Sequence, residues 1–289
     1  ELAYPASKIA ERWPTAAERK QHLQAFDEFI AGQKDSPYLQ ALKNSDLAAR
    51  LREDRLDFYW GTAEVIYDQP EKILHAKDKT EYHLAPKLQP YFREIDKELL
   101  LFSPYFVPGK EGTAFLTDLA GRGVRVRILT NSLSSTDVGL VHSGYMKYRE
   151  QLLRGGVELY ELNKKLTREQ RKQKKGQEGS SKASLHTKSF VFDRKKVFIG
   201  SLNLDPRSVV ENTEIGVIVA SPEMAHEMST GFDENIEQFA FRLELKKGKL
   251  LWHGFENGKP RTFTVEPYTS LWRRFSVGFM RLLPIESQL

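Results

Sequence analysis

Short apolar runs alternate with amphipathic stretches along the chain from residue 86 onward. Runs rich in leucine, valine, isoleucine and phenylalanine predict strands, and the stretches with apolar residues three or four apart predict helices. We expect strands at 98–103, 124–129, 157–162, 185–192, 196–200 and 215–220, and helices at 86–96, 113–120, 138–153 and 223–240. This alternation is typical of an α/β fold, so we expect a mixed, mostly parallel sheet with helices on both faces.

The first 85 residues follow a different pattern. Residues 56–67 are rich in aromatic and β-branched side chains and predict a strand, which Pro70 ends before a mobile basic loop at 72–79. Residues 15–32 end at a glycine and predict a packing helix with these apolar positions: Leu23, Phe26, Phe29 and Ile30. We therefore assign residues 1–85 to an N-terminal helical and linking segment.

A second amphipathic pattern lies near the end of the chain, in a segment assigned to residues 266–289. Residues 270–283 carry arginines largely on one side, and the other side of the expected helix is apolar: Leu271, Trp272, Phe275, Phe279, Leu282 and Leu283. A helix with this composition either lies in the interface of a lipid bilayer or packs against the core. The segment between the two ends, residues 86–265, is the expected catalytic domain.

Composition restricts the functional classes. The net charge of +5 favours anionic partners such as acidic lipid headgroups or nucleic acid, although so modest an excess also serves solubility. Much of the excess lies in residues 163–182, which we interpret as a solvated connection or as an arm that attracts anionic headgroups. The chain has no cysteine, which excludes disulfides and thiolate zinc sites, and no run of about 18 apolar residues that would span a membrane.

One segment, residues 186–214, concentrates the residue types that phosphoryl chemistry uses. His186 and Lys188 are two apart on a predicted strand, so both side chains leave the same face. An imidazole attacks phosphorus or transfers a proton, and an ammonium group stabilises charge that develops on phosphoryl oxygens. Ser201 and Asn203 add neutral donors at the end of the next strand. Such a set needs no metal ligands, so we expect neither a metal nor a cofactor.

A complete motif, H-x-K-x4-D-x6-G-[GS]-x-N, is formed by six residues: His186, Lys188, Asp193, Gly200, Ser201 and Asn203. With this motif the chain resembles the phospholipase D superfamily. Further segments resemble the C-type branch of the bacterial cardiolipin synthases, at 103–112, 128–145, 156–162 and 200–216. The resemblance implies a phospholipase D fold and the C-terminal half of a pseudo-twofold, two-motif enzyme. It also implies a phosphatidyltransferase that makes cardiolipin from phosphatidylglycerol and a second phospholipid through a phosphohistidine.

The resemblance gives each motif residue a role. His186 and Lys188 are the expected catalytic residues, Lys188 as a point charge that holds phosphate. Ser201 and Asn203 are expected to bind the phosphate or an imidazole, although a strand-end cap also explains them. Asp193 is expected to stabilise the turn of the motif.

Glu214 lies where relatives of this superfamily carry an acidic residue that orients the histidine of the other motif copy. A carboxylate bonded to one imidazole nitrogen fixes the tautomer of the ring and stabilises its charged form. An ordinary strand-end glutamate is the alternative. His75 and Lys77 also form an H-x-K sequence, but Tyr82 stands where the motif requires aspartate, so we exclude that site.

Five residues outside the motif are candidates to line a substrate groove: Tyr105, Phe106, Asn131, His142 and Tyr145. They follow predicted strands or lie on the helix after the strand that ends near residue 129. Packing explains the aromatic members equally well.

The resemblance also implies a missing partner, because the reaction needs one imidazole that attacks phosphorus and another that serves the leaving alcohol. The chain contains one complete motif, so the second belongs to a preceding N-terminal half or to a second copy of the chain. With a preceding half, His186 is the expected general acid and base. The expected location is peripheral, on the cytoplasmic face of the bacterial inner membrane, against anionic phospholipids. We do not expect nucleic acid as a partner, although a dimeric phosphodiesterase or nuclease is the alternative function.

Overall fold

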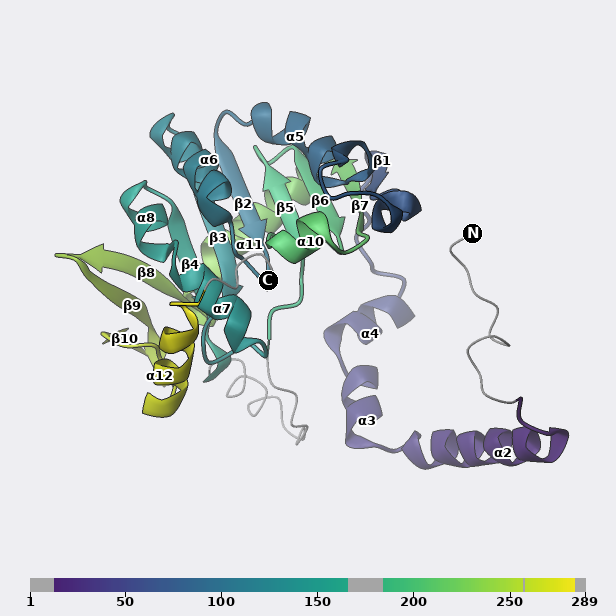
Figure 1. Ribbon diagram of the computed structural model, residues 1–289. Coiled ribbons are helices and arrows are strands. Elements are labelled where there is room, and N and C mark those ends of the chain that lie inside the picture. Colours follow the sequence, from purple (N-terminus) through teal and green to yellow (C-terminus); the bar gives the residue numbers. More distant parts are fainter. Residues whose placement is uncertain (1–12, 166–183, 257, 284–289) are drawn as a thin grey trace. The chain divides into compact units, whose positions relative to one another are not determined.

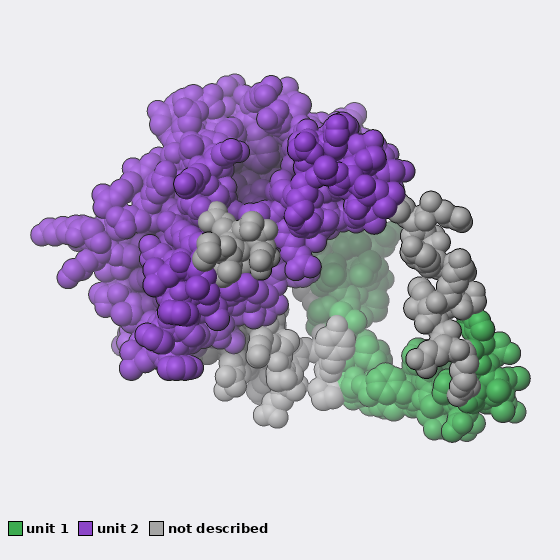
Figure 2. Space-filling model, viewed as in Figure 1, with its two compact units in different colours: residues 1–58, 170–181 green, residues 59–169, 182–289 purple. Residues whose placement is uncertain are grey.

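The computed structural model describes residues 13–165, 184–256 and 258–283. It divides into two units, shown in Figure 2: residues 1–58 with 170–181, and residues 59–169 with 182–289. All predicted strands from residue 98 onward and the complete motif belong to the second unit.

Unit 1 contains, in its described part, the helices α2 (Ala16–Gln33), α3 (Pro37–Lys43) and α4 (Asp46–Arg52). Helix α2 begins with a capping box, since Glu18 N donates to Thr15 Oγ1 at 3.2 Å and Thr15 N donates to Glu18 Oε2 at 2.7 Å. The predicted helix is therefore confirmed. Its predicted packing is wrong in the structure, because its large apolar side chains are exposed: Leu23, Phe26, Phe29 and Ile30.

Unit 2 is built on one 10-stranded sheet in the order β1-β7-β6-β5-β2-β3-β4-β8-β9-β10 (Figure 1). The strands are β1 (Thr62–Tyr67), β2 (Glu98–Phe102), β3 (Arg125–Asn131), β4 (Glu158–Leu162), β5 (Ser189–Phe192), β6 (Lys196–Gly200), β7 (Ile215–Ala220), β8 (Ala240–Lys246), β9 (Lys249–Glu256) and β10 (Lys259–Phe263). Within the described residues, β3 pairs in parallel with β2 and with β4, and every other neighbouring pair is antiparallel. The mixed sheet is confirmed, but the expectation that it would be mostly parallel is wrong.

Helices cover both faces of this sheet, as expected. They are α5 (Ala85–Arg93), α6 (Gly109–Gly121), α7 (Gly139–Met146), α8 (Arg149–Arg154), α10 (Pro206–Val210), α11 (Pro222–Phe239) and α12 (Leu271–Met280), with 3-10 turns at Pro70–Leu74 and Thr80–Tyr82. The alternation along β2 separates two cores, because Leu99 and Leu101 pack with Leu119 of α6, whereas Leu100 packs with Phe232 of α11. The predicted helix at 138–153 is divided into α7 and α8.

The strand directions bring one set of strand ends together at a single edge of the sheet. Phe102, the last residue of β2, lies opposite Ser189, the first residue of β5. Gly200, the last residue of β6, lies opposite Gly216 at the start of β7. Because β2 and β3 are parallel, the end of β3 lies at the same edge. The segments that carry the motif enter and leave the sheet at this edge, which we call the motif edge (Figure 1).

Helix α12 packs on α7 and carries an exposed apolar face. Val277 is buried, whereas Leu271, Trp272 and Phe275 are 79%, 75% and 65% exposed, and Phe279 and Leu282 are also exposed. The helix therefore docks through its other side and leaves the predicted apolar face open. Among the helices that the structure describes, none is long and apolar enough to cross a membrane.

Candidate active site at one edge of the sheet

His186 lies in an irregular segment just before β5, which begins at Ser189 and not at residue 185 as predicted. The amide of Asn131, at the end of β3, holds the residue before it: Leu185 N donates to Asn131 Oδ1 at 2.9 Å, and Asn131 Nδ2 donates to Leu185 O at 3.2 Å. Asn131 is buried, and its side-chain amide makes the pair of hydrogen bonds that a neighbouring strand would otherwise make to this backbone. Asn131 was predicted to line a substrate groove. In the structure its amide instead holds the backbone next to the exposed His186.

Lys188 continues the sheet by its backbone, since Gly200 N donates to Lys188 O at 3.1 Å. Leu185 packs against the core below α11, and Phe190 belongs to the core below α5 and α6. The alternation of side chains along the segment therefore directs His186 and Lys188 to the α5 and α6 side of the sheet.

The ammonium group of Lys188 lies close to two carboxylates. Its Nζ donates to His186 O at 3.1 Å. Burial lowers the pKa of Lys188 below its usual value, while the charges of Glu214 and Asp205 act in the opposite direction. Asp205 is itself buried, and burial raises its pKa. A phosphate bound here would meet one cation and two neighbouring acids.

Ser201 and Glu214 are linked within this chain. Ser201 Oγ donates to Glu214 Oε2 and accepts from Ile215 N at 3.0 Å, while Asn212 Nδ2 donates to Glu214 Oε1 at 3.2 Å. Glu214 is 7% exposed. The structure thus places Glu214 at the motif edge, with its carboxylate held beside the motif serine.

Asn203 has an incompletely bonded amide. Its Nδ2 donates to Ser208 Oγ at 3.4 Å, and its buried Oδ1 has no hydrogen-bond partner among the described residues. Unsatisfied buried amide atoms are rare and point to a ligand or to a different orientation of the amide. With the amide reversed, the hydroxyl of Ser208 would donate to the oxygen and the NH2 group would be free to donate to phosphate.

Asp193 lies at the opposite edge of the sheet and supports the turn between β5 and β6. Asp193 and Arg194 both have positive φ, and the Asp193 carboxylate accepts from the backbone N–H groups of Asp96, Lys97 and Glu98 at 2.8 to 3.0 Å. Burial alone would raise the pKa of Asp193, but these hydrogen bonds outweigh it and lower the pKa below its usual value. Its geometry is that of a structural residue distant from His186, in keeping with its expected role.

We expect Asp193→Asn to destabilise the protein near neutral pH and to have a smaller effect in acid. A carboxyl group whose pKa is depressed by folding stabilises the protein above its unfolded pKa of about 3.9, and this contribution is lost as the pH falls through the folded pKa. Urea unfolding of both proteins at pH values above and below about 4 measures the difference. A difference that stays constant with pH would contradict the prediction, and Asp54→Asn is the control, because Asp54 also has positive φ but is exposed.

Tyr105 lies beside the site, and Phe106 lies in the core. The Tyr105 hydroxyl donates to Asp137 Oδ1 at 2.9 Å. Burial, this hydrogen bond and the charges of Asp137 and Asp205 raise the pKa of Tyr105 to about 12. Phe106 is 1% exposed and belongs to the core.

His142 and Tyr145 lie in a buried polar cluster and not in an open groove, contrary to their predicted placement. Arg149 bonds to Glu161 at 2.9 Å and to Glu266 at 2.6 Å, and His142 Nε2 lies 3.7 Å from Glu266 Oε1. Burial would raise the pKa of Glu266, but the Arg149 guanidinium outweighs it and holds the value at about 2. The cluster joins α7 and α8 to β4 and the segment before α12.

Two residues that hold Glu214 were not predicted from the sequence. Asp68 follows β1 and accepts from Glu214 N at 2.7 Å and from Leu84 N at 2.5 Å. Its partner Lys72, 3.0 Å away, donates to the carbonyls of Val209 and Asn212 at 3.0 and 2.6 Å. Both side chains are 1% exposed, so the interpretation of Lys72 as part of a mobile basic loop is wrong. The spacing of an aspartate and a lysine four apart was the available signal.

Among the described residues, no group of three or more histidines, aspartates or glutamates is arranged to hold a metal ion. The residues at the motif edge are those of an anion site: one lysine, one histidine and amide or hydroxyl donors. Comparison with known proteins gives this site a family.

Residues 91–236 match the family described as "Cardiolipin synthase, PLD-like domain". Cardiolipin synthase C of Escherichia coli (strain K12) is 38% identical over 252 residues, which cover 86% of this chain and 53% of that protein. An uncharacterized protein of Helicobacter pylori (strain ATCC 700392 / 26695) is 31% identical over 245 residues, 84% of this chain and 47% of that protein. The chain spans about half the length of these curated relatives.

Among solved structures, the phospholipase D family member Nuc from Salmonella typhimurium matches with a TM-score of 0.44 and 14% identity, over 62% of this chain and 97% of that one. The family match covers about half of the chain and includes every residue from His186 to Glu214. The chain therefore belongs to the family of cardiolipin synthase PLD-like domains, within the phospholipase D superfamily.

Proposed function

We propose that this chain is one half of a phosphatidyltransferase that forms cardiolipin from phosphatidylglycerol and a second phospholipid. The observation that carries the proposal is the convergence of His186, Lys188 and Asn203 at one sheet edge, with a buried amide oxygen of Asn203 unsatisfied. The 38% identity to a cardiolipin synthase supports lipid as the substrate class.

The proposed chemistry is a double displacement at phosphorus. A nucleophilic imidazole forms a P–N bond to the phosphatidyl group, the P–O bond to the leaving glycerol breaks, and a second imidazole gives that oxygen a proton. The second imidazole then removes the proton of the incoming hydroxyl, whose oxygen forms a new P–O bond as the P–N bond breaks. We assign the acid and base role to His186, and Lys188 stabilises the phosphoryl oxygens in both steps.

The second H-x-K motif comes from another half or from a second copy of this chain. His186 is the histidine of the one complete motif in the sequence, and the chain spans about half of its curated relatives. Glu214 would then orient the imidazole of the partner, by exchanging its bond from Ser201 for one from that ring. The half that carries the first motif is the partner that the lengths of the relatives favour.

The site of action that we propose is the membrane surface, on the cytoplasmic face of the bacterial inner membrane. The exposed Leu271, Trp272 and Phe275 of α12 form an apolar face, with Arg274 on the same helix and Arg281 at its C-cap. Aromatic and leucine side chains beside arginines suit the interface of an anionic bilayer. Binding through this face would bring the sheet edge to diacyl substrates.

We expect the 289-residue chain alone to form no cardiolipin from phosphatidylglycerol, and the chain joined to the half with the first motif to form it. The reason is that one motif supplies one of the two imidazoles. The measurement is product formation in mixed vesicles, with gel filtration to establish the oligomeric state. Cardiolipin formed by a monomer of this chain would contradict the two-imidazole proposal. Cleavage of DNA or RNA without lipid turnover would contradict the transferase and establish the nuclease.

A further inference from the structure

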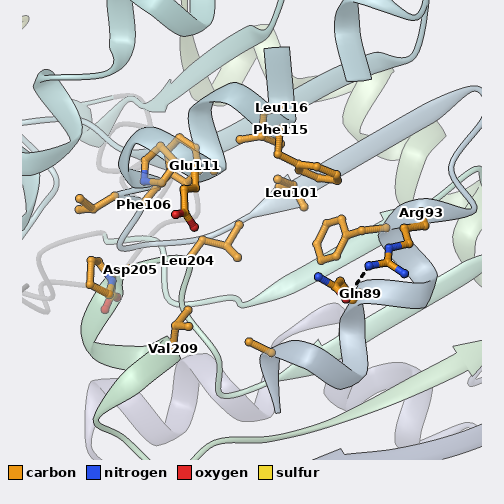
Figure 3. A pocket seen from close by; sticks show the side chains of 16 residues that line it. Gln89, Arg93, Leu101, Phe106, Glu111, Phe115, Leu116, Leu204, Asp205 and Val209 are labelled. Carbon is orange, nitrogen blue, oxygen red and sulfur yellow. Dashed lines mark hydrogen bonds between the residues drawn. The ribbon is translucent and has the colours of Figure 1, made fainter. Parts of the chain in front are cut away.

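An apolar cavity of about 530 Å³ lies on the α5 and α6 side of the sheet (Figure 3). Its walls come from α5, the end of β2, α6 and the segment that leads into α10. Most of its lining is apolar and includes these side chains: Phe92, Leu101, Phe106, Phe115, Leu204 and Val209. The residues lie in four different parts of the sequence, so the cavity is a product of the fold.

The cavity shares a wall with the candidate active site. Asn203 belongs to the motif edge, and the next residues, Leu204 and Asp205, line the cavity. Leu204 is fixed on both sides of its backbone, because its N donates to Ser103 Oγ at 3.0 Å and its O accepts from Val107 N at 2.7 Å. Asp205 acts electrostatically on Lys188. One rigid segment therefore joins the phosphate-binding edge to the apolar space.

Both features also lie on the same side of the sheet. Leu101 lines the cavity and pairs in register with Phe190 of β5. Lys188 is two residues before Phe190, so its side chain leaves the sheet on that side. A molecule with its phosphate at Lys188 can thus extend along this face without crossing a strand.

The chemistry of the lining selects an alkyl chain. Arg93 Nη2 already donates to Gln89 Oε1 at 3.0 Å, and these two residues lie at the opposite end of the cavity from Asp205 in Figure 3. Apart from Glu111 of α6, the side chains between the two ends are aromatic or aliphatic and offer no donor or acceptor to a sugar, a base or a headgroup. Polar groups placed there would lose their hydrogen bonds to water, whereas each methylene placed there gains by leaving water.

We propose that this cavity binds one acyl chain of the phospholipid whose phosphate is held at His186 and Lys188. The inference rests on the proposed function and deepens it, because it assigns the diacyl part of the substrate to a site built from α5, α6 and the start of α10. The cavity selects by chain length, since a long chain fills it and a short chain does not.

Binding of cis-parinaric acid, a fluorescent fatty acid, to the 289-residue chain tests the proposal without any turnover. Dipalmitoyl phosphatidylglycerol is expected to displace the probe at least about tenfold better than the dihexanoyl lipid. Val209→Trp fills the cavity from α10 and is expected to weaken probe binding by at least about tenfold. Ala85→Phe fills the cavity from α5 and is expected to have the same effect. The test therefore still holds if one of the two variants fails to fold.

Matched controls separate the cavity from other apolar surfaces. Val210→Trp changes the next residue of α10, which is half-buried like Val209 and is not part of the cavity lining, and should bind the probe normally. Trp272→Ser on α12 should also bind it normally. Unchanged binding in folded Val209→Trp and Ala85→Phe, or loss of binding only in Trp272→Ser, would overturn the proposal. If the 289-residue chain shows the chain-length preference but the chain joined to the half with the first motif forms no cardiolipin, the acyl site is retained and the proposed reaction is rejected.

Discussion

His186→Asn is expected to lower phosphatidyl transfer by about 10²–10⁴-fold in the assembled enzyme, with little change in thermal stability. The magnitude is that of a lost general acid and base. The thermal stability should persist because His186 is exposed. Its segment is held by the two hydrogen bonds between the Leu185 backbone and the Asn131 amide, which the substitution leaves in place. Initial rates of cardiolipin formation and thermal unfolding measure the two effects.

The chain offers a matched control for this prediction. His75 is also exposed and also begins an H-x-K sequence, but its ring stacks on Tyr82 with centroids 4.2 Å apart. His75→Asn should therefore leave the rate nearly unchanged. Equal losses of transfer rate in His75→Asn and His186→Asn would indicate a general effect of histidine replacement and would contradict the assignment of His186 as the general acid and base. An unchanged rate in His186→Asn would do the same.

The motif could be predicted from the sequence because its spacing encodes local geometry. Lys188 and Asn203 lie at the ends of two adjacent strands joined by the turn at Asp193, so a short stretch of chain fixes their proximity. Glu214, which directly precedes β7, was identified through the resemblance to the family. Positions that depend on local spacing can be predicted from the sequence, because few long-range contacts determine them.

The direction of the strands was harder to predict. Strands separated by helices usually pair in parallel, and β2, β3 and β4 do so. The chain then returns from β4 to β5 through a long connection, and β5 enters the sheet beside β2 in the opposite direction. The strands β8, β9 and β10 were not predicted, although Phe241 and Leu243 alternate with Arg242 and Glu244 in β8, which is the pattern of a strand.

The residues that support the site from a distance left little signal in the sequence. His142 and Tyr145 follow a strand that ends at the active edge, yet the fold turns them into a cluster around Arg149. Asn131 kept its place near the site but serves the backbone of Leu185. Long-range packing decides which side chains of a helix or of a strand end face the substrate. The sequence pattern carries no information about that packing.

The buried pair of Asp68 and Lys72 extends the site beyond the matched family segment, which begins at residue 91. The pair ties the end of β1 to the backbone of Glu214 and to the carbonyls of Val209 and Asn212. Glu214 and the cavity wall at Val209 are thus held by the same ion pair, Glu214 through Asp68 and Val209 through Lys72. The position of both depends on residues that precede the family segment.

Lys72→Met is expected to lower the free energy of unfolding by about 3 kcal/mol. Removal of one partner from a buried ion pair typically costs about 3–5 kcal/mol, because the other charge stays buried without compensation. The lower end applies since Asp68 keeps the N–H groups of Leu84 and Glu214 as donors. Urea unfolding near neutral pH measures the loss.

Lys77→Met is the matched control, because Lys77 also pairs with an acidic residue, Glu211, but its side chain is 67% exposed. Surface pairs contribute less than about 1 kcal/mol, so this variant should unfold almost like the parent protein. Asp68→Leu combined with Lys72→Met should recover part of the stability of Lys72→Met alone, since no unpaired charge remains. Equal, small losses in the two lysine variants would show that Lys72 is solvated in solution. They would then remove the argument that this pair holds Glu214 at the edge where His186 acts.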